Sequence, residues 1–122
     1  MHLGWSVPFH PGLWSGKLKK TLLQQTYPVY LLEIERSECC FDSVEAIANH
    51  LRDAIEANLS VRIIGLFDHF AHTRRIPEGQ MAENIRAAVN LVFCFGLTLP
   101  EPVQLACRPR SVGICETDEG FV

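Results

Sequence analysis

The stretch from Val61 to Arg75 constrains the fold of this chain more than any other part of the sequence. Val61–Phe67 is a short run rich in β-branched and large apolar residues, which is typical of a central strand with apolar side chains on both faces. The segment Asp68–Arg75 follows at once and carries one carboxylate, two imidazoles and two guanidiniums. Because α/β domains often display their chemistry where a strand ends, this segment is the first candidate site.

Hydrophobic periodicity predicts the other elements. A helix is expected between Asp42 and Asn58, because Asp42 and Glu45 can form a capping box ahead of residues with helical spacing. Val89–Gly96 can continue a helix predicted over Gln80–Ala88 or switch to a strand, and its β-branched and aromatic residues favour the strand. In chain order, the predicted strands are 29–36, 61–67, 89–96, 111–116 and a last one from 121, and a short helix is predicted at 103–107.

These elements predict an α+β fold, a two-layer α/β sandwich in the order β-α-β-α-β-(short α)-β-β with a mixed sheet. Residues 29–122 are expected to form one domain. Residues 1–28 are expected to form an irregular arm, because prolines and glycines break any period there. The large arm side chains Trp5, Phe9 and Trp14 could dock on the domain or on a partner. The second arm of the last hairpin holds only Phe121 and Val122, which predicts a domain truncated at its C-terminus.

Composition narrows the function classes. The chain has 122 residues, 48% of them hydrophobic and 20% charged, which is typical of a globular domain and argues against disorder. Its formal charge of −3 argues against nucleic acid as a partner. The five cysteines show no Cys-x-x-Cys spacing, which favours reduced thiols in the cytoplasm. No apolar run approaches the roughly eighteen residues of a spanning helix, so no membrane partner is expected.

Two kinds of small-ligand site follow from the residues after the central strand. Asp68, His69 and His72 could contribute to a metal site, because imidazole and carboxylate groups suit zinc and similar ions. In an extended chain His69 would point away from the other two, whereas in a coiled one His69 and His72 come together. The alternative is a purely structural role, in which Asp68 caps a turn and the histidines form local hydrogen bonds.

A site for a small anionic ligand is the second kind. Arg74, Arg75, Arg108 and Arg110 could gather at neighbouring strand ends, where guanidinium groups suit carboxylate or phosphate. The bland alternative is that these arginines lie in water or pair with glutamates. Cys107 beside Arg108 is the best candidate for a reactive thiol, and its base would have to be His69 or His72. No cofactor is indicated by the sequence.

Several short motifs resemble a known family. They are Phe67-Asp68-His69 at the end of the central strand, the step Phe95-Gly96, and Arg108-Pro109-Arg110 before the last hairpin. Together they resemble the bacterial family catalogued as domain of unknown function number three hundred and two. That resemblance implies a compact cytoplasmic α/β sandwich with no established activity to transfer.

The sequence therefore predicts a soluble bacterial α/β domain that is noncatalytic and either binds a small ligand or pairs with a protein partner. Homodimerisation through the arm and an unpaired sheet edge is the expected form of that pairing. The alternative is a metal-binding protein or an enzyme that uses the segment Asp68–His72.

Overall fold

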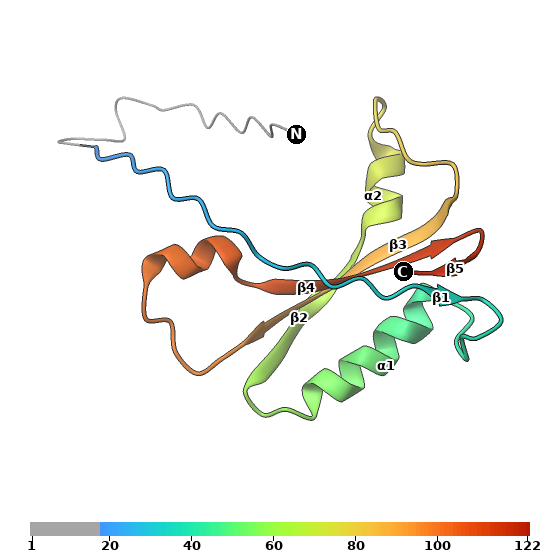
Figure 1. Cartoon of the computed structure of the whole chain (residues 1–122), viewed down its shortest axis with the longest axis horizontal. Helices are drawn as coiled ribbons and strands as arrows, with labels where there is room; N and C mark the ends of the chain where they lie inside the picture. The colour runs from blue at the N-terminus through green and yellow to red at the C-terminus, as the bar shows by residue number, and fades with distance from the viewer. Residues whose placement is uncertain (1–17) are drawn as a thin grey trace.

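The computed structural model describes residues 18–122, so the expectations for Trp5, Phe9 and Trp14 lie outside the described residues. In chain order the elements are β1 (Ile34–Glu35), α1 (Val44–Glu56), β2 (Val61–Asp68), α2 (His69–Arg75), β3 (Ile85–Phe95), the 3₁₀ helix η2 (Pro102–Cys107), β4 (Arg110–Thr117) and β5 (Gly120–Phe121) (Figure 1). The predicted α+β class is confirmed.

The strands form one sheet in the order β1-β5-β4-β3-β2, and every neighbouring pair is antiparallel. The predicted mixed sheet is therefore wrong. A parallel pair would need a connection that returns to the other end of the strand. In register, Asp68 at the end of β2 lies opposite Val89 of β3, and Val61 at its start lies opposite Phe95. The chain thus re-enters the sheet beside the end of β2 and runs back along it.

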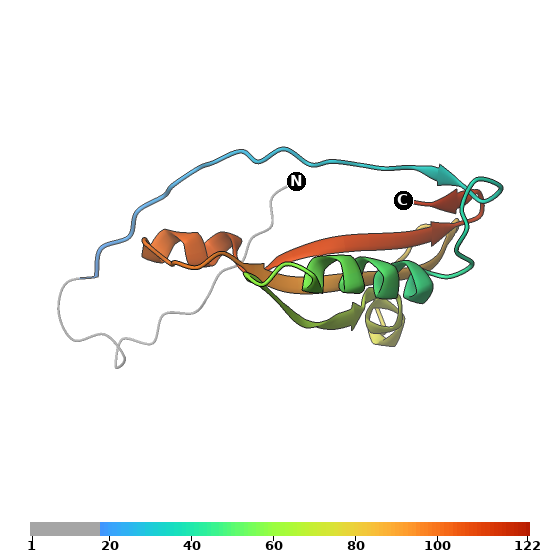
Figure 2. The ribbon, with the colours of Figure 1, turned by 90° about the horizontal axis from the view of Figure 1, so that it is seen from below.

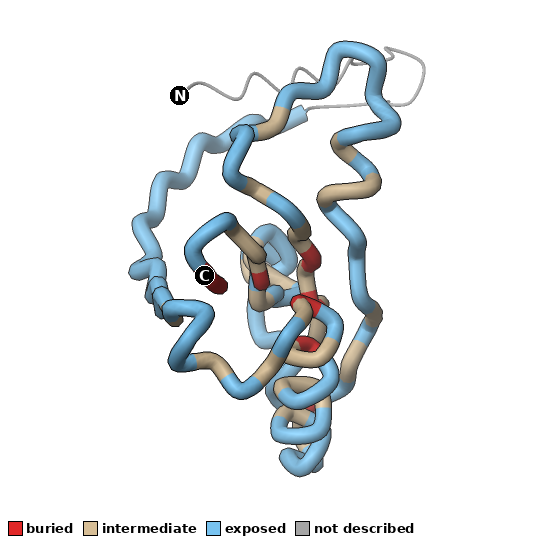
Figure 3. Tube along the Cα trace, turned by 90° about the vertical axis from the view of Figure 1, so that its right-hand side faces the viewer, coloured by how far each residue is buried: buried red, intermediate tan, exposed pale blue. Residues whose placement is uncertain are grey.

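The helix α1 covers one face of the sheet. Its buried residues Val44 and Ala48 pack against Val89, Ile114 and Phe121 from three different strands. The side chain of Ser43 caps this helix by accepting a hydrogen bond from the backbone N–H of Ala46 at 3.0 Å. The sequence prediction placed the cap one residue earlier, and that was wrong. In Figure 3 the buried positions gather where α1 meets the sheet.

The helix α2 lies against the opposite face, near the start of β3 (Figure 1). Side chains alternate along a strand, so Ala88 faces α2 while the neighbouring Val89 faces α1. His69 and Phe70 of α2 line a cavity of about 240 Å³ together with Ala88. The two helices therefore lie on different faces of the sheet.

Two predicted boundaries were wrong. Residues 85–88 belong to β3 and not to a helix over Gln80–Ala88, because they pair with β4, while β3 also pairs with β2 from Val89 onward. That pairing places the alternating residues Val89 and Leu91 in the core, with exposed fractions of 4% and 0%. The predicted strand 29–36 is reduced to Ile34–Glu35. Figure 2 shows the chain before β1 running along the sheet, with β5 between β1 and β4.

Replacement of Gly120 by Ala is expected to weaken the attachment of β1. An added Cβ would overlap the carbonyl oxygen of Ile34 and lie 2.9 Å from the amide nitrogen of Arg36. We expect the free energy of unfolding to fall by about 1–3 kcal/mol, measured by urea denaturation. Gly113→Ala is the matched control, because its nearest neighbour would be the Asn90 side chain at an ordinary 3.6 Å. Equal losses in the two variants would contradict this packing.

Candidate functional site

An apolar groove of about 400 Å³ lies between β4 and the chain that precedes β1. Its lining includes Leu31, Ile34, Ile47, Leu51, Val112 and Ile114. Ile47 and Leu51 come from α1, where they are partly buried and pack against the core cluster. We call this surface the β4 groove. Concave, mostly apolar surfaces of this size are typical of binding sites.

The backbone of β4 borders this groove. Cys115 exchanges two hydrogen bonds with Val122, each of 2.9 Å, on the side of β4 that faces away from β3. In an antiparallel strand every second residue directs both its N–H and its C=O to the same side. Ser111 and Gly113 therefore direct theirs into the groove. Within residues 18–122, no strand pairs with them on that side.

The opposite wall of the groove is formed by the segment just before β1. Val29, Tyr30, Leu31 and Leu32 have exposed fractions of 82%, 90%, 75% and 72%. Scattered exposed apolar residues are ordinary, but a contiguous run of four is a feature of interaction surfaces. This wall of the groove thus offers apolar side chains that the described chain leaves uncovered, whereas on the β4 side Ile114 is buried and Val112 is partly buried.

The segment predicted to carry metal chemistry folds as the first turn of α2. The Asp68 carboxylate accepts a hydrogen bond from the backbone N–H of Ala71 at 2.9 Å and caps this helix. The rings of His69 and His72 lie 6.2 Å apart, and both contact Phe67. The structure brings the two imidazoles together as expected for a coiled segment. Within residues 18–122, no three histidine, cysteine or acidic side chains form a group that could hold a metal ion.

The four predicted anion-binding arginines fall into two separate pairs. Asp68, just before α2, pairs in register with Val89 of β3, whereas Arg110 pairs with Phe93. Val89 and Phe93 are separated by about 13 Å along the strand. Arg74 and Arg75 lie on α2, which begins beside Val89 and not beside Phe93. Arg74 stacks on the ring of Phe70 at 5.4 Å. Arg108 donates a hydrogen bond to the carbonyl of Thr98 at 3.0 Å.

A polar cavity of about 270 Å³ brings Arg108 and Arg110 together with Tyr27 and Cys107. The Cys107 thiol lies 3.0 Å from the Tyr27 hydroxyl, and Arg110 lies over the tyrosine ring at 5.7 Å. The side-chain hydrogen bond with Cys107 raises the pKa of Tyr27. Cys107 lies at the η2 end of the sheet, so the structure does not place it beside His69 or His72.

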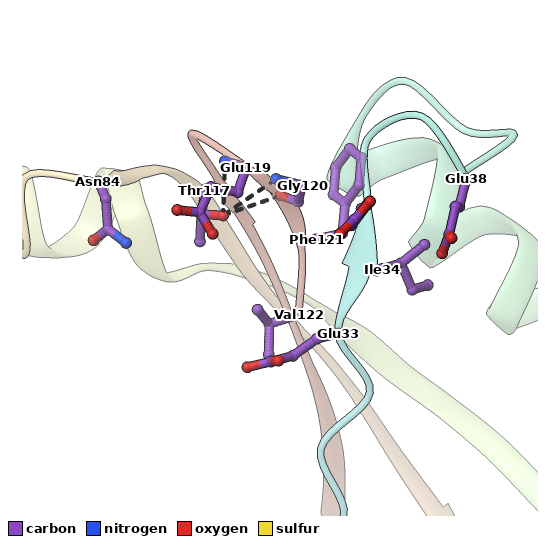
Figure 4. Close-up of a pocket in the computed structure, with 10 residues that line it drawn as sticks. Glu33, Ile34, Glu38, Asn84, Thr117, Glu119, Gly120, Phe121 and Val122 are labelled. Atoms are coloured by element: carbon purple, nitrogen blue, oxygen red, sulfur yellow. Dashed lines mark hydrogen bonds between the residues drawn. The ribbon is translucent and has the colours of Figure 1, made fainter.

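An acidic cavity of about 440 Å³ lies at the β5 end of the groove. Glu33, Glu35, Glu38 and Glu119 contribute to its lining, and Figure 4 shows Glu33 beside Val122. Nearby, Arg36 pairs with Glu116 at 3.1 Å. Sequence reasoning missed both this cavity and the β4 groove, because each depends on the return of the last hairpin to the chain before β1. The alternation of Glu33 and Glu35 was the available signal for the acidic cavity.

Two further groups have shifted pKa values. Burial raises the pKa of the Cys115 thiol, which lies on β4. The hydrogen bond between Arg86 and Asp118, 2.6 Å long, raises the pKa of Arg86. Both shifts have structural causes in the sheet and its last turn.

The fold and these surfaces define a small α+β domain with an antiparallel sheet and an open apolar groove. The chain belongs to a family of unknown function, DUF6858, whose model matches residues 18–122. The expectation of a domain of unknown function is confirmed, but the family resembled by the motifs is not the family matched. Comparison with curated proteins and with solved structures gives no match. Within the described residues, no helix is both long and apolar enough to cross a membrane.

The capping role of Asp68 is tested by two substitutions. Asp68→Ala removes the acceptor for the Ala71 amide and is expected to lower the free energy of unfolding by about 0.5–2 kcal/mol. Asp68→Asn keeps a capping oxygen and should change it by less than about 0.5 kcal/mol. Thermal denaturation in metal-free buffer checks both. A loss for Asn as large as the loss for Ala would show that the charge of Asp68, and not its cap, stabilises this end of β2.

Proposed function

We propose that this domain is a noncatalytic protein-interaction module that binds an extended polypeptide segment in the β4 groove. The observation that carries the proposal is the combination of free backbone groups on Ser111 and Gly113 with an apolar wall beside them. Strand addition to a sheet edge uses this combination, because backbone hydrogen bonds supply affinity and side-chain pockets supply specificity. The domain is proposed to act in the bacterial cytoplasm, with its cysteines reduced.

The groove sets the character of the bound segment. In a bound strand alternate side chains point to one face, so every second side chain would meet Ile47, Leu51 and Ile114 on the α1 side. These positions favour Val, Ile, Leu or an aromatic residue. Each backbone hydrogen bond to β4 contributes a net of about 0.5–1.5 kcal/mol, so a segment of four or five residues gains most of its affinity from the apolar contacts.

A peptide of alternating valine and threonine, blocked at both ends and carrying a fluorophore, is expected to bind this groove. Leu31→Glu places a charge on the groove wall and should weaken binding at least roughly tenfold, because the carboxylate would be desolvated by the peptide. Leu59→Glu is the matched control, since Leu59 is 89% exposed and does not line the groove. Fluorescence anisotropy measures both affinities. Equal affinities in the two variants, or no binding to the unmodified domain at a concentration at which it is monomeric, would refute the proposal.

Small-anion binding is a second candidate function, and a specific observation favours it. Arg108 and Arg110 line one polar cavity with the hydroxyl of Tyr27, and two guanidinium groups beside a hydroxyl suit a carboxylate or phosphate. Calorimetric titration with inorganic phosphate tests it, with Arg110→Gln against Arg75→Gln. Loss of phosphate binding in the first variant alone would support the site.

The alternative of a metalloprotein or enzyme at Asp68, His69 and His72 has its own test. Elemental analysis of protein purified without a histidine tag would support it by a stoichiometric metal ion that His72→Ala removes. Metal-free protein that gains no thermal stability when zinc is added would exclude it, because a ligand that binds only the folded state must raise that stability.

A further inference from the structure

The β4 groove is one strand wide. β5 is hydrogen-bonded to β1 on one side and to β4 on the other. Its last pairs join Ile34 to Phe121 and Cys115 to Val122. A strand that continued β5 in register past Val122 would lie between Leu32 and Ile114, and then between Tyr30 and Val112. We call this open strand position the lane. A strand in this lane would have one neighbour on each side, at the ordinary spacing of a sheet.

We infer that this lane is filled by residues 29–32 of a second copy of the chain, in a two-fold symmetric dimer that exchanges these segments. The inference rests on the proposed strand-binding function of the groove. The exposed residues suggest the partner. Val29, Tyr30, Leu31 and Leu32 form an extended apolar segment that is exposed to solvent, and the lane accepts an extended apolar segment.

Symmetry supports this occupant. β5 runs antiparallel to both β1 and β4, so a strand that continues the pattern of β5 must run antiparallel to the segment 29–32 of its host. A two-fold axis perpendicular to the sheet relates two copies of one segment in that antiparallel way. The order across the dimer would be β4, the partner's segment, the host's segment and the partner's β4. One operation therefore fills both lanes and covers both exposed segments.

Charge supports the same direction of insertion. The inserted segment runs in the direction of β5, so its N-terminal side leaves the lane beside Val122. The acidic cavity lined by Glu33, Glu35 and Glu119 lies at that end (Figure 4). The residues that precede the inserted segment include Lys19 and Lys20. The basic stretch of one copy is thus carried toward the acidic end of the other, which assists association at low ionic strength.

Light scattering across a range of protein concentrations tests the inference. The unmodified protein is expected to pass from monomer to dimer as concentration rises. Leu31→Glu should raise the dimer dissociation constant at least roughly a hundredfold, because two carboxylates would meet near the two-fold axis in an apolar lane. Leu59→Glu should leave it unchanged. A peptide of residues 28–33 should dissociate the dimer by competing for the lane.

The possible outcomes distinguish the dimer from the proposed binding of an extended segment in the β4 groove. A protein that stays monomeric while the alternating peptide binds at the groove would overturn the second copy as occupant and leave strand binding intact. A dimer that Leu31→Glu does not weaken would place the contact elsewhere and overturn the inference. A monomer in which the amides of Ser111 and Gly113 already exchange slowly with solvent would show that one chain fills its own lane, and would also overturn it.

Discussion

The pairing of β3 with both of its neighbours holds the rest of this structure in place. β3 has 11 residues and exchanges hydrogen bonds with β2 and β4 along most of its length. It supplies Val89 and Leu91 to the core under α1, and its other face supports α2. Because one edge of β4 pairs with β3, only its second edge can pair with another strand. β5 pairs with one end of that second edge, and the β4 groove lies along the unpaired rest of it.

The elements that could be predicted from sequence are those fixed by local patterns. The strand Val61–Asp68, the helix near residues 44–56, the short helix before Arg108 and the last hairpin all have a periodicity or a turn signal of their own. The strand at residues 85–88 could not be predicted in this way. Met81, Ile85 and Ala88 have helical spacing, but the long-range ladder of residues 85–88 with β4 overrides that local preference. The antiparallel order of the sheet also depends on the long-range register between neighbouring strands.

The candidate site illustrates the same limit. The residues Asp68, His69 and His72 were found because they are close together in sequence. In the structure Asp68 caps α2, which is the structural alternative to a ligand-binding role. Their ligand-binding role stays a prediction. The β4 groove joins residues near 31, 51 and 113, and no local pattern links those positions. The exposed run before β1 was visible in the sequence only as the alternation of a strand, and its exposure is evident only from the structure.

The central claim is that the outer edge of β4 is open in a single domain and closes when a strand enters it. Amide hydrogen exchange followed by NMR at a concentration that favours the monomer tests this most directly. The Cys115 amide, bonded to Val122, should exchange slowly, whereas the amides of Ser111 and Gly113 should exchange rapidly and gain protection as a strand binds. Protection of Ser111 and Gly113 that equals that of Cys115 in the unbound monomer would contradict the account.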